Sequence, residues 1–177
     1  MAGDARLRLF CALTLPGETV ERLVAWQAGE LRGGRVVPPQ NLHVTLAFLG
    51  GRPAGELPAI AGCLRDAARG AAGPRLELRG YRETRSVAML TFADEGGRAT
   101  ALAERLQEGL ERLGVYRREA RPWLPHVTVL RFRERPRLEP ALPELGPVVL
   151  SDAAVFMSRL RPGGAEYESV ETVALGG

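Results

Sequence analysis

The chain has 177 residues, of which 45% are hydrophobic and 25% are charged, values typical of a soluble globular protein with one core. It contains no run of about 18 apolar residues, which excludes a transmembrane helix, and no secretory signal is visible. All 24 basic residues are arginines, which excludes P-loop proteins, Schiff-base enzymes and ligases that adenylate their own lysine. The two cysteines, Cys11 and Cys63, lie in apolar settings without metal-site spacing and predict buried free thiols in a reducing cytosol, so we expect a cytoplasmic protein.

The first half of the chain alternates strand and helix patterns. Apolar and β-branched residues at period two predict strands over 6–15 and 42–49. Apolar stripes at helical spacing predict helices over 18–31 and 53–69. The second strand is expected to close at the glycine pair 50–51.

The second half begins with weaker strand patterns and ends in a hairpin. Its predicted elements are strands over 76–78 and 86–93, a helix over 98–113, a strand over 125–132, a charged Pro-rich loop over 133–147, and hairpin strands over 148–159 and 165–175.

A strand–helix–strand unit at 6–49 has a counterpart at 86–132, with equivalent strands about 80 residues apart. Such a duplication typically gives a pseudo-two-fold molecule whose equivalent strands face each other across the axis. We therefore expect an α+β fold of two lobes, with mainly antiparallel sheets, helices outside and a central groove. The whole chain, 1–177, is expected to be a single domain made of the two duplicated lobes.

Both histidines of the chain open the tripeptide His-Val-Thr, at positions 43 and 126. Each tripeptide lies in a predicted strand, where residues i and i+2 share a face. His43 and Thr45 therefore point one way from the first strand. His126 and Thr128 likewise share one face of the second strand. Because the two strands are equivalent, we expect the two His/Thr faces to meet across the groove.

Two histidines that face one another can act as an acid and a base. Since histidine titrates near neutral pH, one ring can take a proton from an attacking water while the other donates a proton to the leaving oxygen. This division suits in-line displacement at phosphorus. Threonine hydroxyls can donate hydrogen bonds to phosphate oxygens, and an arginine guanidinium can donate two at once to a pair of these oxygens. A metal site needs more ligands than two histidines, so no metal is expected. Neither motif holds a nucleophile elbow, which argues against a serine-type triad. No other cofactor is expected.

With these motifs the chain resembles the 2H phosphoesterases, which are named for two His-x-Thr/Ser-x motifs. Within them it resembles the bacterial and archaeal RNA 2′,3′-cyclic phosphodiesterases, historically called 2′-5′ RNA ligases. The resemblance covers nearly the whole chain and is carried by segments 9–13, 37–50, 121–131 and 158–167. Val129 and Leu130 depart from the Leu-Ala usual in the family, but both changes are apolar and should alter packing alone.

The resemblance implies metal-independent hydrolysis of a 2′,3′-cyclic phosphate at an RNA end to a 2′-phosphate. It makes His43 the proton donor to the departing 3′ oxygen and His126 the base that activates water. Thr45 and Thr128 would hold the phosphate, as would Arg131, which follows the second histidine by five residues. Simple alternation puts Arg131 on the face opposite His126, so a strand end or a bulge is needed if Arg131 is to reach the site.

Two aromatic residues and one basic stretch each have two interpretations. Trp123 either stacks on a nucleobase, where it would bind substrate, or packs between the lobes. Phe48 raises the same question, and alternation favours the core. The arginine-rich stretch 131–137 is either a patch that faces RNA or a solvated loop.

Three functions remain open from the sequence. The first is the phosphodiesterase, and the second is the reverse reaction, a 2′-5′ ligation that uses the same groups. The third is a module that binds RNA or nucleotides without turnover, although a pure binder need not keep both an acid and a base. The expected partners are RNA ends or nucleotides that carry a 2′,3′-cyclic phosphate. No membrane partner is expected, and we expect a monomer.

Overall fold

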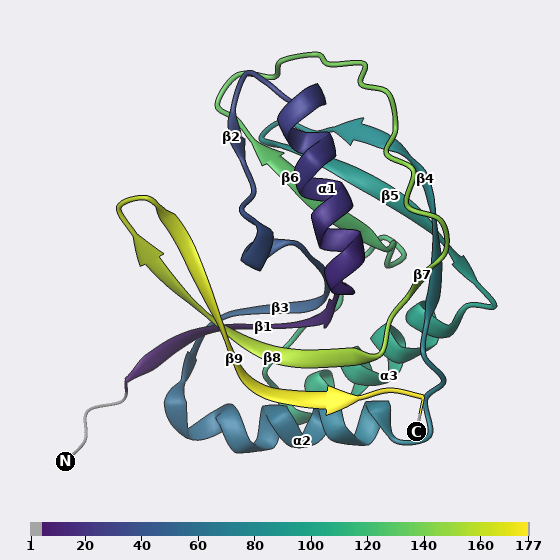
Figure 1. Ribbon diagram of the computed structural model, residues 1–177. Coiled ribbons are helices and arrows are strands. Elements are labelled where there is room, and N and C mark those ends of the chain that lie inside the picture. The colour runs from purple at the N-terminus through teal and green to yellow at the C-terminus, as the bar shows by residue number, and fades with distance from the viewer. Residues whose placement is uncertain (1–4, 177) are drawn as a thin grey trace.

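The strands described by the computed structural model, which covers residues 5–176, form one antiparallel sheet (Figure 1). These strands are β1 (Arg6–Thr14), β2 (Arg35–Val36), β3 (His43–Pro53), β4 (Arg75–Glu83), β5 (Val87–Glu95), β6 (His126–Arg131), β7 (Val148–Val149), β8 (Asp152–Arg161) and β9 (Gly164–Ala174). The α-helices are α1 (Gly17–Glu30), α2 (Leu57–Ala68) and α3 (Arg98–Leu113). Short 3₁₀ helices at Pro39–Asn41 and Ala54–Glu56 precede β3 and α2. The α+β class is confirmed.

The strand order is symmetrical about the centre of the sheet. It runs β7-β4-β5-β6-β3-β1-β8-β9, with the short β2 beside β6. The unit β1–α1–β3 therefore corresponds to β5–α3–β6, which is the arrangement that a duplication would produce. The two central strands pair antiparallel through Val44 and Val127, the middle residues of the two His-Val-Thr motifs. The motifs meet at the centre of the sheet, on the pseudo-two-fold axis.

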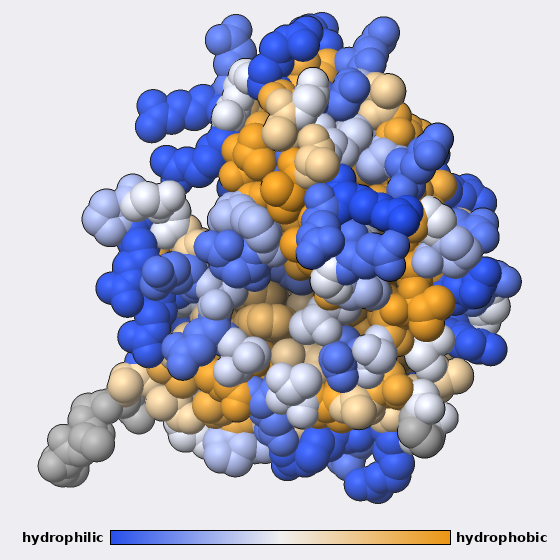
Figure 2. Space-filling model, viewed as in Figure 1, coloured by the Kyte–Doolittle hydropathy of each residue, from blue (hydrophilic) through white to orange (hydrophobic). Residues whose placement is uncertain are grey.

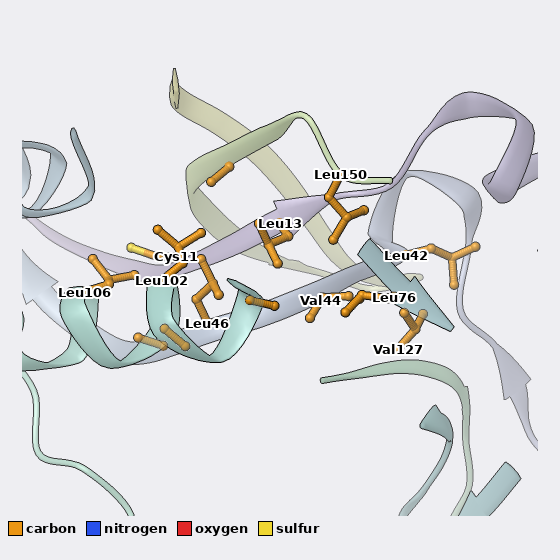
Figure 3. Close-up of a cluster of buried hydrophobic side chains, with 14 of the residues drawn as sticks. Cys11, Leu13, Leu42, Val44, Leu46, Leu76, Leu102, Leu106, Val127 and Leu150 are labelled. Atoms are coloured by element: carbon orange, nitrogen blue, oxygen red, sulfur yellow. The ribbon is translucent and has the colours of Figure 1, made fainter. Parts of the chain in front are cut away.

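One buried apolar cluster holds the central strands in place (Figure 3). Val44 and Val127 belong to this cluster, so the histidine and threonine on either side of each valine face the other way. Helix α3 adds Leu102, Leu106 and Leu110, which repeat every four residues and are buried. Each buried leucine contributes roughly 1.5–3 kcal/mol relative to an exposed one, so the motifs are built on a well-anchored core.

The helices cover different parts of the sheet. Helices α2 and α3 lie side by side along β1, β3 and β8, at the bottom of Figure 1. Helix α1 lies over the other half, across β6. Within residues 5–176, none of the helices is both long and apolar enough to cross a membrane.

Three predicted strands differ clearly from those observed. The strand expected over 76–78 is longer and runs from Arg75 to Glu83 as β4. The strand expected over 148–159 is two strands, because β7 pairs with β4 at one end of the sheet and β8 pairs with β1 in the other half. The chain crosses between the halves at this break. The strand expected to close at the glycine pair 50–51 continues to Pro53, because Gly50 tolerates a positive φ of 70° and still pairs with Leu9.

Candidate active site

The two histidines begin the two central strands of the sheet. His43 is the first residue of β3, and His126 is the first residue of β6. Because the valines between the motif residues pair antiparallel, His43 lies toward Thr128 and Thr45 lies toward His126. All four side chains line one pocket of about 470 Å³. The four motif residues that the sequence singled out are therefore brought together.

Both imidazole rings are held in the same way. Nδ1 of His43 lies 2.7 Å from the carbonyl oxygen of Asn41, and Nδ1 of His126 lies 3.0 Å from that of Leu124. In each case the carbonyl belongs to the residue two positions earlier. Because a carbonyl oxygen only accepts, Nδ1 must carry a hydrogen in both rings. Nε2 is therefore the atom that gains or loses a proton in each histidine.

Thr45 contacts the titrating nitrogen of His43 directly. Its Oγ1 lies 2.9 Å from Nε2 of the ring. When the imidazole is neutral, the threonine hydroxyl donates to Nε2, and when it is protonated, Nε2 donates to the hydroxyl. Thr45 can therefore stabilise either protonation state of His43 by rotation of one hydroxyl.

A β-bulge at the same place in each central strand brings a further residue to the pocket. Thr45 and Ala47 pair with consecutive residues of β1, so Leu46 is the extra residue in β3. Thr128 and Leu130 pair with consecutive residues of β5, so Val129 is the extra residue in β6. Each bulge places two consecutive residues in the core and reverses the alternation that follows.

Arg131 and Phe48 both reach the pocket because of these bulges. Each lies five residues after its histidine, and each lines the pocket wall. The bulge that Arg131 requires is thus present. The expectation that alternation carries Phe48 into the core is wrong, since the side chain is 51% exposed. The guanidinium of Arg8 lies 5.0 Å from the centre of the Phe48 ring, close enough for a cation–π contact.

Two buried glutamines hold the bulges. Nε2 of Gln27, on α1, donates to the carbonyl of Val129 at 3.0 Å and to that of Val37 at 3.1 Å. Nε2 of Gln107, on α3, donates to the carbonyl of Leu46 at 2.8 Å. These donors help to satisfy buried carbonyls at the bulges, and the Val129 carbonyl also accepts from the Val37 backbone nitrogen at 3.1 Å. The helix of each half therefore secures the bulge in the central strand of the other half.

Aromatic rings surround His43 on the pocket side. Phe10 of β1 stacks on its imidazole with the ring centres 4.9 Å apart. Tyr167 of β9 meets the same imidazole edge-on at 5.5 Å, and Phe156 of β8 lies at 6.2 Å. This enclosure removes much of the ring of His43 from water.

The pKa of His43 is lowered to about 4. Burial among the aromatic rings is the main cause, because it disfavours the charged imidazolium. The hydrogen bond to the Asn41 carbonyl acts in the opposite direction, while the positive charges of His126 and Arg131 lower the pKa further. In the free protein His43 is therefore neutral at pH 7, and the pocket is suited to an anion that would offset the nearby positive charges.

Comparison with known proteins gives the family. Residues 16–161, most of the chain, match the 2′-5′ RNA ligase superfamily. The chain belongs to the 2′-5′ RNA ligase superfamily. The family predicted from the two His-Val-Thr motifs is thereby confirmed.

The similarity of this chain to two relatives and one solved structure covers between 70% and 98% of its length. A Thermus thermophilus protein named RNA 2′,3′-cyclic phosphodiesterase is 37% identical over 97% of this chain and 91% of its own length. An Escherichia coli protein of the same name is 34% identical over 70% of this chain and 71% of its own. The crystal structure of E. coli LigT complexed with 3′-AMP has a TM-score of 0.83 and 26% identity, covering 98% of this chain and 100% of that one.

In this member of the 2′-5′ RNA ligase superfamily, Trp123 is not among the residues that line the pocket. Its ring is half-buried against the core, and its indole Nε1 donates to the carbonyl of Thr45 at 3.0 Å. This contact ties the segment before β6 to β3. It favours the packing interpretation of Trp123 over stacking on a nucleobase.

Several pocket residues were not predicted from the sequence to have a function. Asn41 links His43 to the β8–β9 hairpin, since its carbonyl accepts from the imidazole and its Nδ2 donates to the carbonyl of Ala165 at 2.8 Å. Tyr167 reaches the pocket because the hairpin folds over it. Phe10 lies two residues after Arg8 on the same strand, and the alternating arginines Arg6 and Arg8 at the start of this largely apolar strand were the available signal for a solvated face.

The two cysteines are free and lie outside the pocket lining. Cys11 is buried as predicted, and burial raises the pKa of its thiol to about 12. Cys63, which was expected to be buried, is partly exposed because it lies at the edge of the core face of α2. Among residues 5–176 no three or more histidine, cysteine or acidic side chains gather as potential metal ligands.

Proposed function

We propose that this chain hydrolyses a 2′,3′-cyclic phosphate at the end of an RNA to a 2′-phosphate, with His43 and His126 as a metal-independent acid–base pair. The observation that carries the proposal is the matched anchoring of the two rings. Nδ1 of each ring is fixed on a backbone carbonyl, which leaves Nε2 as the proton-exchanging atom at one shared pocket, and Nε2 of His43 also contacts the Thr45 hydroxyl. The names of the Thermus and E. coli relatives support the same activity.

The reaction requires one proton to be taken up and one to be delivered. Nε2 of His126 removes a proton from water as the water oxygen bonds to phosphorus. The bond from phosphorus to the 3′ oxygen breaks, and Nε2 of His43 gives its proton to that oxygen. The product carries a 2′-phosphate and a free 3′ hydroxyl, and the two histidines exchange protonation states. In-line geometry places the two rings on opposite sides of the phosphorus.

The low pKa of His43 has a consequence for this mechanism. A proton donor must be protonated before the reaction, yet a ring with a pKa of about 4 is neutral at pH 7 in the free protein. The cyclic phosphate carries a negative charge, which raises the pKa of a neighbouring imidazole. Substrate binding would therefore favour protonation of His43, so His43 becomes an acid only when the leaving group is present.

The remaining motif residues would hold the phosphate. The hydroxyls of Thr45 and Thr128 can donate to its non-bridging oxygens, and the guanidinium of Arg131 can bind them in pairs. The exposed ring of Phe48 offers an apolar wall to the nucleoside. E. coli LigT has been crystallised with 3′-AMP, which supports a nucleotide as the occupant of the equivalent pocket here.

Ligation is the second candidate, because the family is described as a 2′-5′ RNA ligase superfamily. The same two histidines would act with an RNA 5′-hydroxyl in place of water. In dilute RNA the water reaction should dominate, since water is present at a far higher concentration. The cytoplasmic location and the monomeric state stay predictions.

The test is product analysis of a short RNA that ends in a 2′,3′-cyclic phosphate, incubated in EDTA. Conversion to a 2′-phosphate by the wild-type protein, lost in both His43→Ala and His126→Ala, is the expected result. Activity that depends on an added metal would contradict the mechanism. RNA binding without conversion would point to a binding module instead.

A further inference from the structure

A second groove adjoins the catalytic pocket at the end of β6. It has a volume of about 790 Å³ and lies between the turn before β2 and the segment that follows β6. Arg131 lines both the pocket and this groove, so the two are adjacent. The other basic residues of the groove are Arg35, Arg133 and Arg135. Figure 2 shows hydrophilic side chains projecting from this part of the surface, at the upper left of the view.

The charge of the groove is largely uncompensated. Arg35, Arg131 and Arg133 form no ion pair with any carboxylate among residues 5–176. Arg35 and Arg131 are directly opposite each other in the β2–β6 pair, which places two positive charges on one face. Glu134 is the acidic residue of the lining. Like charges held side by side without a counter-ion favour an anionic ligand.

A groove on another side of the pocket has no such excess of unpaired positive charge. It lies on the β8–β9 hairpin and also contains two arginines. Arg159 pairs with Glu168 at 3.6 Å, and Arg161 pairs with Glu166 at 3.1 Å. Its positive charges are therefore balanced within the hairpin. Of these two grooves, the one past Arg131 is the one that a polyanion would follow.

A buried carboxylate holds the arginine-bearing segment in a fixed conformation. The side chain of Glu83 is 2% exposed and accepts hydrogen bonds from the backbone nitrogens of Arg137 and Leu138, at 2.9 and 2.8 Å. It also accepts from Arg135 Nε at 3.2 Å and from the Tyr81 hydroxyl at 2.6 Å. Four donors on one buried carboxylate are costly to break. The stretch 131–137 is thus a built wall rather than a freely solvated loop.

The opposite wall approaches so closely that only glycine fits. A Cβ at Gly34 would lie 2.4 Å from the carbonyl oxygen of Arg131, and a Cβ at Gly33 would lie 2.8 Å from a side-chain carbon of Pro136. Gly33 also has a φ of 83°, a conformation that other residues rarely adopt. The glycine pair therefore lets the turn before β2 close the floor of the groove.

We propose that this groove binds the phosphodiester backbone on the 5′ side of the terminal nucleotide, which makes single-stranded oligonucleotides the preferred substrates over cyclic mononucleotides. The inference rests on the proposed function. A cyclic phosphate occupies the 3′ end, so one RNA strand leaves the pocket, and it leaves through its 5′ phosphate. Past Arg131 that strand meets Arg35 and Arg133, whose guanidinium groups can each contact a phosphate.

The test compares kcat/KM for a 2′,3′-cyclic mononucleotide and for an octanucleotide with the same terminal nucleotide. The wild-type ratio of octanucleotide to mononucleotide is expected to be large at low salt. The double variant Arg35→Ser/Arg133→Ser should lower that ratio by about tenfold and make its salt dependence shallower by about 1.4 on a log–log plot, for two lost single-strand phosphate contacts. Arg159→Ser/Arg161→Ser removes the same charge beside the same pocket and should leave the ratio at its wild-type value.

Three outcomes would overturn the inference, and they separate it from the proposed function. If the wild-type protein hydrolyses both substrates with a ratio near one, the groove does not bind the RNA backbone, although the proposed activity stands. If the ratio falls equally in the two double variants, the oligonucleotide is attracted by the overall positive charge and is not bound in this particular groove. Failure of the wild-type protein to hydrolyse either substrate removes the proposed function itself.

Discussion

Gln27 and Gln107 hold equivalent strand bulges in opposite halves of the molecule. Gln27 donates to the carbonyl of Val129, the extra residue of β6, and Gln107 donates to that of Leu46, the extra residue of β3. Each glutamine comes from the helix of the other half. The pseudo-two-fold symmetry therefore includes the hydrogen bonds that aim the pocket residues as well as the strands that carry them.

The first prediction follows from what each bulge aims. Gln27→Leu leaves the buried carbonyl of Val129 without that donor and should release Arg131 from the pocket. We expect the Kd for inorganic phosphate to rise by about tenfold. The free energy of unfolding should fall by about 1–3 kcal/mol, the net value of the two hydrogen bonds that Gln27 donates, because the Val129 carbonyl still accepts from the Val37 backbone nitrogen. Phosphate titration and urea unfolding measure the two effects.

Gln107→Leu is the matched control for this prediction. It removes the same kind of hydrogen bond and should cost a similar free energy of unfolding, but its bulge aims Phe48 and not Arg131. Its Kd for inorganic phosphate should stay within about twofold of the wild-type value. Equal weakening of phosphate binding in both variants would show that the loss comes from general destabilisation.

The elements that follow a simple period were predictable, and the bulges were not. Helix α3 has the bounds that its leucine spacing predicts, and the motif faces follow strand alternation. The bulge at Leu46 depends on a hydrogen bond from Gln107, which lies on a different element. Because nothing near Phe48 signals that bond, strict alternation assigned the side chain to the core. Arg131 escaped the same error because the resemblance required a bulge.

The pocket itself was only half predictable, for a related reason. Both histidines and both threonines could be placed from repeated tripeptides. Tyr167 and Asn41 reach the pocket through the way the β8–β9 hairpin folds back onto the segment before β3. Such contacts between distant segments leave no periodic trace. The division of the predicted strand 148–159 into two strands has the same origin, since each part pairs with a different neighbour.

The second prediction concerns the titration of His43. With a pKa of about 4 in the folded chain and an ordinary value of 6.5, the ring binds its proton more readily in the unfolded state. Between these values the free energy of unfolding should therefore decrease as the pH falls, by at most about 1.4 kcal/mol per pH unit from this group. Below about pH 4 both states are protonated and this group adds no further slope.

NMR titration of the two imidazoles checks this assignment. The His43 resonance in the free protein should have its midpoint near pH 4, and added inorganic phosphate should raise the midpoint by supplying a negative charge beside the ring. His43→Gln should remove its contribution to the pH dependence of unfolding. A midpoint near 6.5 in the free protein would mean that the aromatic enclosure does not keep His43 neutral.

The third prediction separates the two interpretations of Trp123. Trp123→Phe keeps an aromatic ring but removes the indole nitrogen that donates to the carbonyl of Thr45. We expect the free energy of unfolding to fall by about 1 kcal/mol, the net value of one hydrogen bond, with KM nearly unchanged. Urea unfolding and steady-state kinetics on cyclic mononucleotides with different bases test this. A KM change that depends on the base would restore a stacking function for Trp123.

The fourth prediction concerns Glu83, which anchors the segment that carries the groove arginines. Burial alone would raise the pKa of this carboxyl. The hydrogen bonds that it accepts from Tyr81, Leu138, Arg135 and Arg137 outweigh burial and hold the pKa below its ordinary value. The carboxylate therefore stabilises the fold above the ordinary glutamate pKa, and this contribution is lost as the pH falls through the lowered value.

Glu83→Gln tests the anchor at neutral pH. The amide nitrogen of glutamine is itself a donor, so it cannot accept the hydrogen bonds that the carboxylate oxygen it replaces accepts. The free energy of unfolding should therefore fall by about 3 kcal/mol, and hydrogen exchange should accelerate over residues 133–138. Glu77→Gln is the control, because Glu77 lies on the same strand with an exposed side chain and should change stability by less than about 0.5 kcal/mol. If both variants are equally stable and the segment keeps its exchange protection, the arginine wall does not depend on Glu83, and its fixed conformation must come from the contact with the glycine pair alone.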